Sequence, residues 1–322
     1  VVEGFAKSKD YEVLLTVVSR AGVESDPVAV TIHPDIPPYE LVRQTLDLNP
    51  DFSGVSATAT NVLKKNIGVV MLYNDPNYGK YVIREQCFNN FESIAYSTRG
   101  LDTLPKQIGA YITDAFGNIS DTLFETIEPL YEVALDRNKF FAYGLGSDKP
   151  TYPGPYTVTR IWNGVASFAD VWHTDILSGA AAAYPYTLTF GIGVKAKLSR
   201  FHFWGRNDRA TWAGESPRIF AIWGSAKDAP ADISLPKGVL EGTVAGDWVN
   251  LGNYVVPNPP SGNSPSAPTD ADRAVWNAGF DFNIPIAAPE VKFIRISIES
   301  TWGNNTYAAI SEMQFFGDPR AK

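Results

Sequence analysis

A stretch near the N-terminus recurs 95 residues later in the chain. Residues 22–34 read GVESDPVAVTIHP and residues 117–129 read GNISDTLFETIEP, with identical residues at six of thirteen positions. About one identity is expected by chance, and a fixed period of this kind indicates repeated structural units. Each copy has an alternating apolar segment, a turn centred on glycine, and a second segment ending on proline, which is the pattern of a β-hairpin.

More strands are predicted between the two copies, at Val55–Thr60, Gly68–Tyr73, Tyr81–Glu85 and Glu92–Ser97. A unit of about 95 residues with some seven short strands has the size of an immunoglobulin-like or fibronectin-type sandwich. We therefore expect residues 35–130 to form one complete sandwich. Residues 1–34 are then the C-terminal hairpin of a truncated module of the same kind.

The pattern changes after residue 130, and all eight tryptophans lie between residues 162 and 302. Ile294, Ile296 and Ile298 alternate with polar residues, which is the period of a strand. We expect residues 131–322 to form one antiparallel jelly-roll sandwich without a helix longer than two turns, and residues 256–272 to be a polar loop. The strands are predicted at Tyr186–Ile192, Leu198–Trp204, Arg218–Gly224, Trp248–Val256, Phe280–Ile284, Lys292–Glu299 and Ile310–Phe316.

The composition and the motifs of the sequence limit the classes of function that are open to this chain. The formal net charge of −8 argues against nucleic acid or an anionic membrane as partner. No run of about 18 apolar residues could span a membrane, and Cys87 is the only cysteine, so an intramolecular disulfide is impossible. The chain lacks a His-Glu-x-x-His motif, a Gly-x-Ser-x-Gly elbow and a phosphate loop. We therefore expect a protein that is not an enzyme, although a glycosidase needs only two carboxylates, for which Asp170 and Asp175 are available.

Seven stretches of the second half resemble the discoidin, or coagulation-factor type C, family of galactose-binding-like jelly rolls over roughly residues 140–318. Fibronectin-like modules followed by such a domain also resemble envelope lipoproteins with which gut bacteria capture polysaccharides. The stretches are Ile161-Trp-Asn-Gly, Val171-Trp-His-Thr, Tyr186-Thr-Leu-Thr-Phe, Leu198-Ser-Arg-Phe-His-Phe-Trp-Gly-Arg, Phe220-Ala-Ile-Trp-Gly-Ser, Phe293-Ile-Arg-Ile and Ile310-Ser-Glu-Met-Gln-Phe-Phe-Gly.

The resemblance implies a non-catalytic carbohydrate-binding protein of the bacterial cell envelope, either anchored to the outer membrane or periplasmic. Its signal and anchor would lie outside this chain, and its partner would be a glycan or polysaccharide. The alternative is a scaffold module that binds other envelope proteins and no sugar.

Sugars present C–H faces and a rim of hydroxyl groups, so a site for them needs aromatic rings and polar side chains. Loops meet at one end of a jelly roll, and the candidates predicted there are Trp172, His173, Arg206, Asp208, Trp212, Trp302 and Asn304. Alternative roles are open for several of them. Trp172 can be a buried wedge beneath its loop, and residues 206–209 can form a solvated turn with local ion pairs of small value.

The resemblance also implies a structural Ca²⁺ between an early loop and the last strand, and no other cofactor. Its side-chain ligands would be Asn163 and Glu312, with backbone carbonyls near Val165 and Ser311. Ca²⁺ takes six to eight oxygens, usually including charged carboxylates. Asn163 stands where the family has Asp, so one charge is missing. The alternative is a plain turn in which Glu312 caps a loop.

Overall fold

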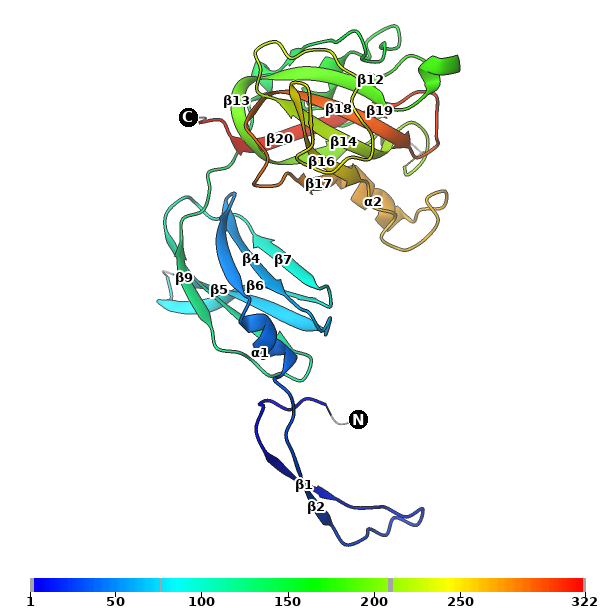
Figure 1. Ribbon diagram of the computed structural model, residues 1–322. Helices are drawn as coiled ribbons and strands as arrows, with labels where there is room; N and C mark the ends of the chain where they lie inside the picture. The colour runs from blue at the N-terminus through cyan, green and yellow to red at the C-terminus, as the bar shows by residue number, and fades with distance from the viewer. Residues whose placement is uncertain (1–2, 76, 208–210, 321–322) are drawn as a thin grey trace. The chain divides into compact units, whose positions relative to one another are not determined.

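The computed structural model describes residues 3–75, 77–207 and 211–320. The chain divides into two units, Val1–Tyr131 and Glu132–Lys322. All pairings between named strands are antiparallel, and helices are short and few (Figure 1). The predicted all-β class, a fibronectin/immunoglobulin-like sandwich and a galactose-binding-like jelly roll, is confirmed.

The first unit contains a sandwich of two sheets with the strand orders β3-β4-β7 and β6-β5-β8-β9 (Figure 1). Strand β3 was not predicted. Pro50 lies within it, and proline is tolerated there because β3 is an edge strand. The strands are β3 Asp47–Asp51, β4 Gly54–Thr60, β5 Ile67–Asp75, β6 Lys80–Asn89, β7 Ser93–Thr98, β8 Lys106–Asp114 and β9 Leu123–Ile127.

The core of this sandwich lies between the inward faces of its two sheets. Val55 of β4 and Val69 of β5 are both buried in it. The helix α1 (Pro38–Arg43) begins with a proline at its first position, where the fixed backbone angle favours a helix. This helix adds Tyr39 and Val42 to the core.

A separate hairpin precedes this sandwich, and its strands pair in the same register as β8 and β9. Tyr11 lies opposite Ile32, and 95 residues further on Lys106 lies opposite Ile127. All five pairs of the first hairpin have such an equivalent in the second. The repeat therefore encodes a hairpin of fixed register. Its strands are β1 Tyr11–Leu15 and β2 Val28–Ile32.

The turns of the two hairpins also agree. Gly22 and Gly117 adopt left-handed backbone angles, with φ of 77° and 84°. In both turns a serine hydroxyl accepts a hydrogen bond from the opposite strand, at 3.0 Å from the nitrogen of Val17 and 2.9 Å from that of Ile112. Ile112 is fully buried, however, whereas Val17 is 74% exposed. That residues 1–34 belong to a further sandwich stays a prediction.

The second unit is organised by one long strand, β13 (Tyr186–Trp204). Its first part pairs with β18 (Val291–Thr301), and after an irregularity its second part pairs with β20 (Glu312–Asp318). Gly193 lies in the irregular part with φ of 70°, and a Cβ there would lie 2.2 Å from the carbonyl oxygen of Lys139. Two strands were predicted here. They form one strand, whose first part pairs in the sheet of β18 and whose second part pairs in the sheet of β20.

The remaining strands extend these two sheets, with β14, β16 and β15 following β18, and β10 following β20. Strands β12 and β19 form a separate pair. The strands are β10 Val133–Ala134, β11 Phe141–Ala142, β12 Trp172–His173, β14 Pro217–Ser225, β15 Val244–Ala245, β16 Trp248–Val255, β17 Phe280–Asn283 and β19 Ala309–Ile310, and the 3₁₀ helices are η1 Arg137–Lys139, η2 Val158–Trp162 and η3 Gly179–Ala182.

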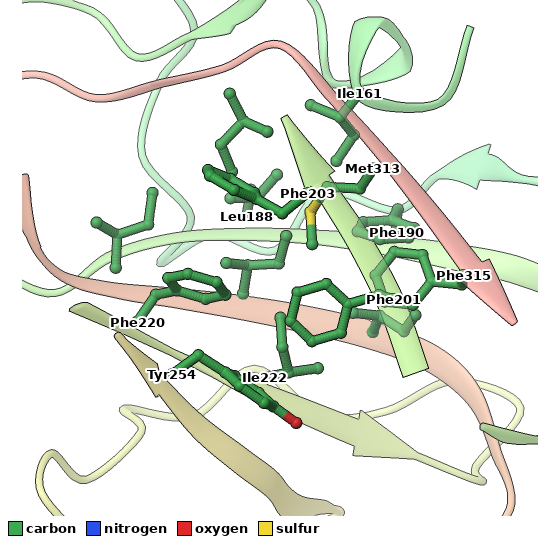
Figure 2. Packing of buried hydrophobic residues seen from close by; sticks show 14 of the residues in the cluster. Ile161, Leu188, Phe190, Phe201, Phe203, Phe220, Ile222, Tyr254, Met313 and Phe315 are labelled. Carbon is green, nitrogen blue, oxygen red and sulfur yellow. The ribbon is translucent and has the colours of Figure 1, made fainter. Parts of the chain in front are cut away.

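The core of the second unit is rich in aromatic rings. Figure 2 shows Phe201 of β13 among side chains of β14, β16 and β20. Its ring centroid lies 4.9 Å from that of Tyr254, 5.6 Å from that of Phe315 and 6.1 Å from that of Phe220. Offset and edge contacts of this kind stabilise a core beyond simple burial.

One helix of this unit was not predicted. The segment expected to be a polar loop, residues 256–272, leads into α2 (Asp270–Ala278), which begins with a capping box between Thr269 and Asp272. Trp276 of α2 is fully buried. Within the described residues, no helix combines the length and the apolar character of a membrane span.

Candidate functional site

A pocket of about 300 Å³ opens where several loops of the second unit meet. Two of its lining residues, His173 and Arg206, were predicted as site residues. His173 ends β12, and Arg206 follows the end of β13. The pocket is lined by Tyr152, Tyr156, His173, Ile176, Arg206, Glu215 and Tyr307.

Aromatic rings surround His173. The rings of His173 and Tyr307 are stacked, with centroids 5.1 Å apart and planes 19° apart. Tyr152 and Tyr156 approach His173 at an angle, with centroid distances of 5.6 Å and 5.8 Å. Tyr152 is 38% exposed and Ile176 is 61% exposed, so the apolar rim is accessible from solvent. The pocket therefore offers several ring faces and edges close together.

Backbone hydrogen bonds hold Tyr152 and Tyr156 against β12. The nitrogen of Tyr152 donates to the carbonyl oxygen of His173 at 2.9 Å, and the nitrogen of His173 donates to the carbonyl oxygen of Tyr156 at 3.3 Å. The Nδ1 atom of His173 bonds to the carbonyl oxygen of Thr174. A carbonyl oxygen only accepts, so Nδ1 carries the hydrogen and Nε2 of the neutral ring is an acceptor.

The polar side of the pocket is formed by Arg206 and Glu215. One guanidinium nitrogen of Arg206 forms an ion pair with Oε1 of Glu215. The backbone of Arg206 is held on both sides, because its nitrogen donates to Oγ of Ser216 at 3.1 Å and its carbonyl accepts from Nε1 of Trp276 at 2.8 Å. The unpredicted helix α2 thus positions a predicted site residue.

Two of the predicted tryptophans are buried and cannot offer a face to a ligand. Trp172 is 1% exposed, which agrees with the alternative that it is buried beneath its loop. Trp212 is also 1% exposed; its Nε1 donates to the carbonyl oxygen of Pro257 at 2.7 Å, and its ring lies 4.9 Å from that of Trp276. The expectation that these tryptophans are exposed platforms is corrected: both belong to the core beneath the loops.

Trp302 and Asn304 do not line the pocket. Trp302 is half-buried, with the guanidinium of Arg218 lying 4.9 Å from its ring centroid. Asn304 is exposed and adopts a left-handed backbone with φ of 51°. Asp208 lies outside the described residues. The roles of Trp302, Asn304 and Asp208 in ligand binding stay predictions.

Sequence reasoning missed the tyrosines that line the pocket. Tyr152 and Tyr156 lie in the segment Thr151-Tyr-Pro-Gly-Pro-Tyr, and Tyr307 follows a polar Gly-Asn-Asn-Thr loop. Aromatic residues next to proline, glycine and asparagine indicate exposed loop rings, and this signal was available. Glu215 carries no comparable signal, because its role depends on its contact with Arg206.

The predicted calcium ligands have other partners. Oε1 of Glu312 lies 2.8 Å from Nη1 of Arg137, and Oε2 accepts from the backbone nitrogen of Gly164 at 3.0 Å. The carboxylate is 2% exposed, and burial raises the pKa of Glu312, opposed by the Gly164 N–H and by Arg137. The amide of Asn163 donates to Asp170 at 3.1 Å.

These contacts do not fit a Ca²⁺ site. The ion needs oxygens at about 2.3–2.6 Å, whereas N–H donors surround Glu312. Among the residues that the structure describes, no three His, Cys, Asp or Glu side chains gather as metal ligands would. The alternative that Glu312 caps a loop describes the contacts better.

Two family models match the chain, and both are described as domains of unknown function. One (DUF5126) covers residues 35–138 and the other (DUF5000) covers residues 162–317. The chain matches none of the curated proteins compared with it.

Several solved structures are similar to this chain. A SusE-like protein is 22% identical, with a TM-score of 0.53, and the match covers 88% of this chain and 100% of that one. A CBM32 domain from a family 31 glycoside hydrolase of Clostridium perfringens is 14% identical over 57% of this chain and 95% of that one, with a TM-score of 0.41. A family 32 CBM of the same organism, solved in complex with galactose, is 13% identical over 57% and 98%, with a TM-score of 0.36. The likeness to the SusE-like protein shows the fold, in which a fibronectin-like sandwich precedes a discoidin-like jelly roll.

Proposed function

We propose that this chain is a non-catalytic carbohydrate-binding protein, and that its second unit captures a glycan in the pocket around His173 and Tyr307. The observation that carries the proposal is the meeting of stacked rings and a polar Arg206–Glu215 pair in one accessible pocket. The similarity of the fold to a SusE-like protein and to carbohydrate-binding modules of family 32 supports it.

The aromatic side of the pocket suits the C–H faces of a sugar. Rings of Tyr152, Tyr156 and Tyr307 can cover such a face and exclude water from it, which is the main favourable term for an apolar surface. The volume of about 300 Å³ lies at the small end of ligand pockets. A short, terminal part of a glycan is therefore the expected ligand.

The polar side suits the hydroxyl groups. Arg206 only donates hydrogen bonds, the Glu215 carboxylate only accepts them, and Nε2 of His173 accepts. A hydroxyl group does both, so adjacent hydroxyls of one sugar ring can use all three side chains. Because the pocket is small and open, we expect weak affinity, roughly millimolar to micromolar, which display of many copies would strengthen.

The pocket lacks the arrangement of a glycosidase. Such enzymes use a pair of carboxylates on either side of the scissile bond. Of the described residues that line the pocket, Glu215 is the one carboxylate, and it is paired with Arg206. Binding without hydrolysis is the function that this lining supports.

Glycan arrays followed by isothermal titration test the proposal. We expect a polysaccharide or oligosaccharide to bind the wild-type chain, and we expect Tyr307→Ala and Arg206→Ala to lose at least tenfold in affinity. Lys227→Ala is the control, since Lys227 is an exposed residue of the same unit that does not line the pocket. Unchanged binding in Tyr307→Ala would reject the site. No binding on a broad panel, together with pull-down of an envelope protein, would favour the scaffold alternative.

We also propose that the chain works in the bacterial cell envelope, with the fibronectin-like sandwich as a spacer. The likeness of the fold to a SusE-like protein supports this. Antibodies against the purified chain, applied to intact and to lysed cells of the source organism, test the location. Detection only in the cytosolic fraction would overturn it.

A further inference from the structure

A network of charged residues holds residues 155–170 of the second unit, called the 155–170 loop, against its last strand β20. At one end of it, Arg160 lies 2.9 Å from Asp170 and donates through Nε to the carbonyl oxygen of Pro155 at 2.8 Å. Asn163 donates to the same carboxylate at 3.1 Å. The Asp170 carboxylate thus joins the C-terminal end of the loop to Arg160 and Asn163 within the same loop.

A second set of contacts ties this loop to β20. Glu312 of β20 accepts from Gly164 of the loop and from Arg137 of η1. Gly164 adopts a φ of 86°, and a Cβ on it would lie 3.2 Å from Nη1 of Arg137, so the close approach depends on glycine. In addition, Oγ of Ser311 donates to the carbonyl oxygen of Ser167 at 2.8 Å.

We propose that the guanidinium of Arg137 is a built-in cation, which takes the position that the discoidin resemblance assigns to Ca²⁺ and joins η1, the 155–170 loop and β20 without a metal. The charge balance carries the proposal. Glu312 is a buried carboxylate, and leaving it without a partner would be costly. Arg137 supplies the positive charge, and its side chain is 37% exposed, so the guanidinium keeps contact with solvent. An added divalent ion would meet this guanidinium at close range.

The cross-link also supports the ligand pocket, a consequence that rests on the proposed function. The 155–170 loop contains Tyr156, whose carbonyl accepts from His173. A loop loosened at Gly164 would lose part of the order of this wall. We therefore infer that glycan capture by this chain does not depend on calcium.

Thermal unfolding of the full chain, followed by tryptophan fluorescence, tests the inference directly. All eight tryptophans belong to residues 162–302, so the signal reports on the second unit alone. We expect the same unfolding midpoint for the wild type in excess Ca²⁺ and in EDTA. A midpoint that rises with Ca²⁺ or falls with EDTA would overturn the proposal.

Variants test the role of Arg137 itself. Arg137→Ala should lower the midpoint, and millimolar Ca²⁺ should raise it again in this variant, because Glu312 then lacks its counter-ion. A wild-type midpoint in Arg137→Ala, or one that Ca²⁺ leaves unchanged, would overturn the proposal. Arg320→Ala is the matched control, since Arg320 pairs with Asp318 at the end of the same strand but is 60% exposed.

A milder change covers the case in which Arg137→Ala does not fold. Arg137→Lys keeps the charge and loses the planar donors, so it should unfold between wild type and the alanine variant and stay insensitive to Ca²⁺. A Ca²⁺-dependent midpoint in Arg137→Lys would contradict the inference. These readouts need no sugar, so they stand if no glycan binds. If a glycan does bind, wild-type affinity should be equal with Ca²⁺ and with EDTA.

Discussion

The imidazole ring of His173 lies nearly parallel to the phenol ring of Tyr307, with 5.1 Å between the centroids and 19° between the planes. The pairing of β12 with β19 brings the two residues together, because His173 lies opposite Ala309 and Tyr307 precedes this strand. The stack is therefore set by strand register, and it does not require a ligand to form.

This geometry separates two contributions of His173 to binding. His173→Phe keeps a ring against Tyr307 but removes both nitrogen atoms, including the acceptor Nε2. One lost hydrogen bond is worth about 1 kcal/mol, so we expect the affinity for the identified glycan to fall about fivefold. Isothermal titration measures this affinity. Tyr152→Phe, which keeps its ring and loses only its hydroxyl group, is the variant for comparison. Equal affinities of His173→Phe and wild type would mean that the histidine acts through its ring alone.

The two loop tryptophans should differ sharply in stability. Trp212→Ala removes a buried ring that packs on Trp276, and such truncations cost about 3–5 kcal/mol. Trp302→Ala removes a half-buried ring and its contact with Arg218, and a surface cation–π contact is worth about 0.5–1 kcal/mol. Urea unfolding followed by the remaining tryptophans measures both. A smaller loss for Trp212→Ala than for Trp302→Ala would contradict the burial of Trp212.

The strands of the jelly roll were predictable because each has an apolar face. In β18, Ile294, Ile296 and Ile298 are fully buried, as the alternation indicates. Arg295 on the opposite face is also buried, since a separate cluster and Asp148 and Asp232 cover it. Local alternation distinguishes the two faces of a strand, but it does not show that loops from elsewhere cover the second face.

The site was only partly predictable for a related reason. Arg206 follows a strand end, and strand ends can be found from periodicity. Whether a loop tryptophan turns inward depends on the space beneath it: Trp212 fills a gap beside Trp276 of a helix that was not predicted. The sequence Thr-Asp-Ala-Asp at residues 269–272 was the available signal for that helix.

The repeated hairpins predict unequal effects of equivalent substitutions. Ile112 of β8 is fully buried, so Ile112→Ala should destabilise the first unit by about 2–5 kcal/mol. Its counterpart Val17 is 74% exposed, so Val17→Ala should change stability by less than about 0.5 kcal/mol. Calorimetry measures the first unit, and tryptophan fluorescence confirms that the second is unchanged. A large cost for Val17→Ala would show that a neighbouring chain covers the hairpin in solution.

Asp272 should make the second unit sensitive to acid. Burial alone would raise the pKa of Asp272, but hydrogen bonds from Ser261 and Thr269 outweigh it and hold the pKa well below its usual range. Because the folded pKa is depressed, this carboxylate stabilises the fold above its ordinary pKa of about 4. The contribution is lost as the pH falls from that value through the folded pKa.

Asp272→Asn isolates this contribution, because its amide carries one acceptor oxygen and brings donors toward groups that already donate. We expect the variant to be less stable than wild type at neutral pH, and the difference in urea midpoint to shrink below about pH 4. Asp270→Asn, an exposed acid in the first turn of α2, is the control and should show little difference at any pH. A gap between wild type and Asp272→Asn that widens on acidification would mean that the carboxylate is not stabilised in the folded state, since the sign of the linkage would be reversed.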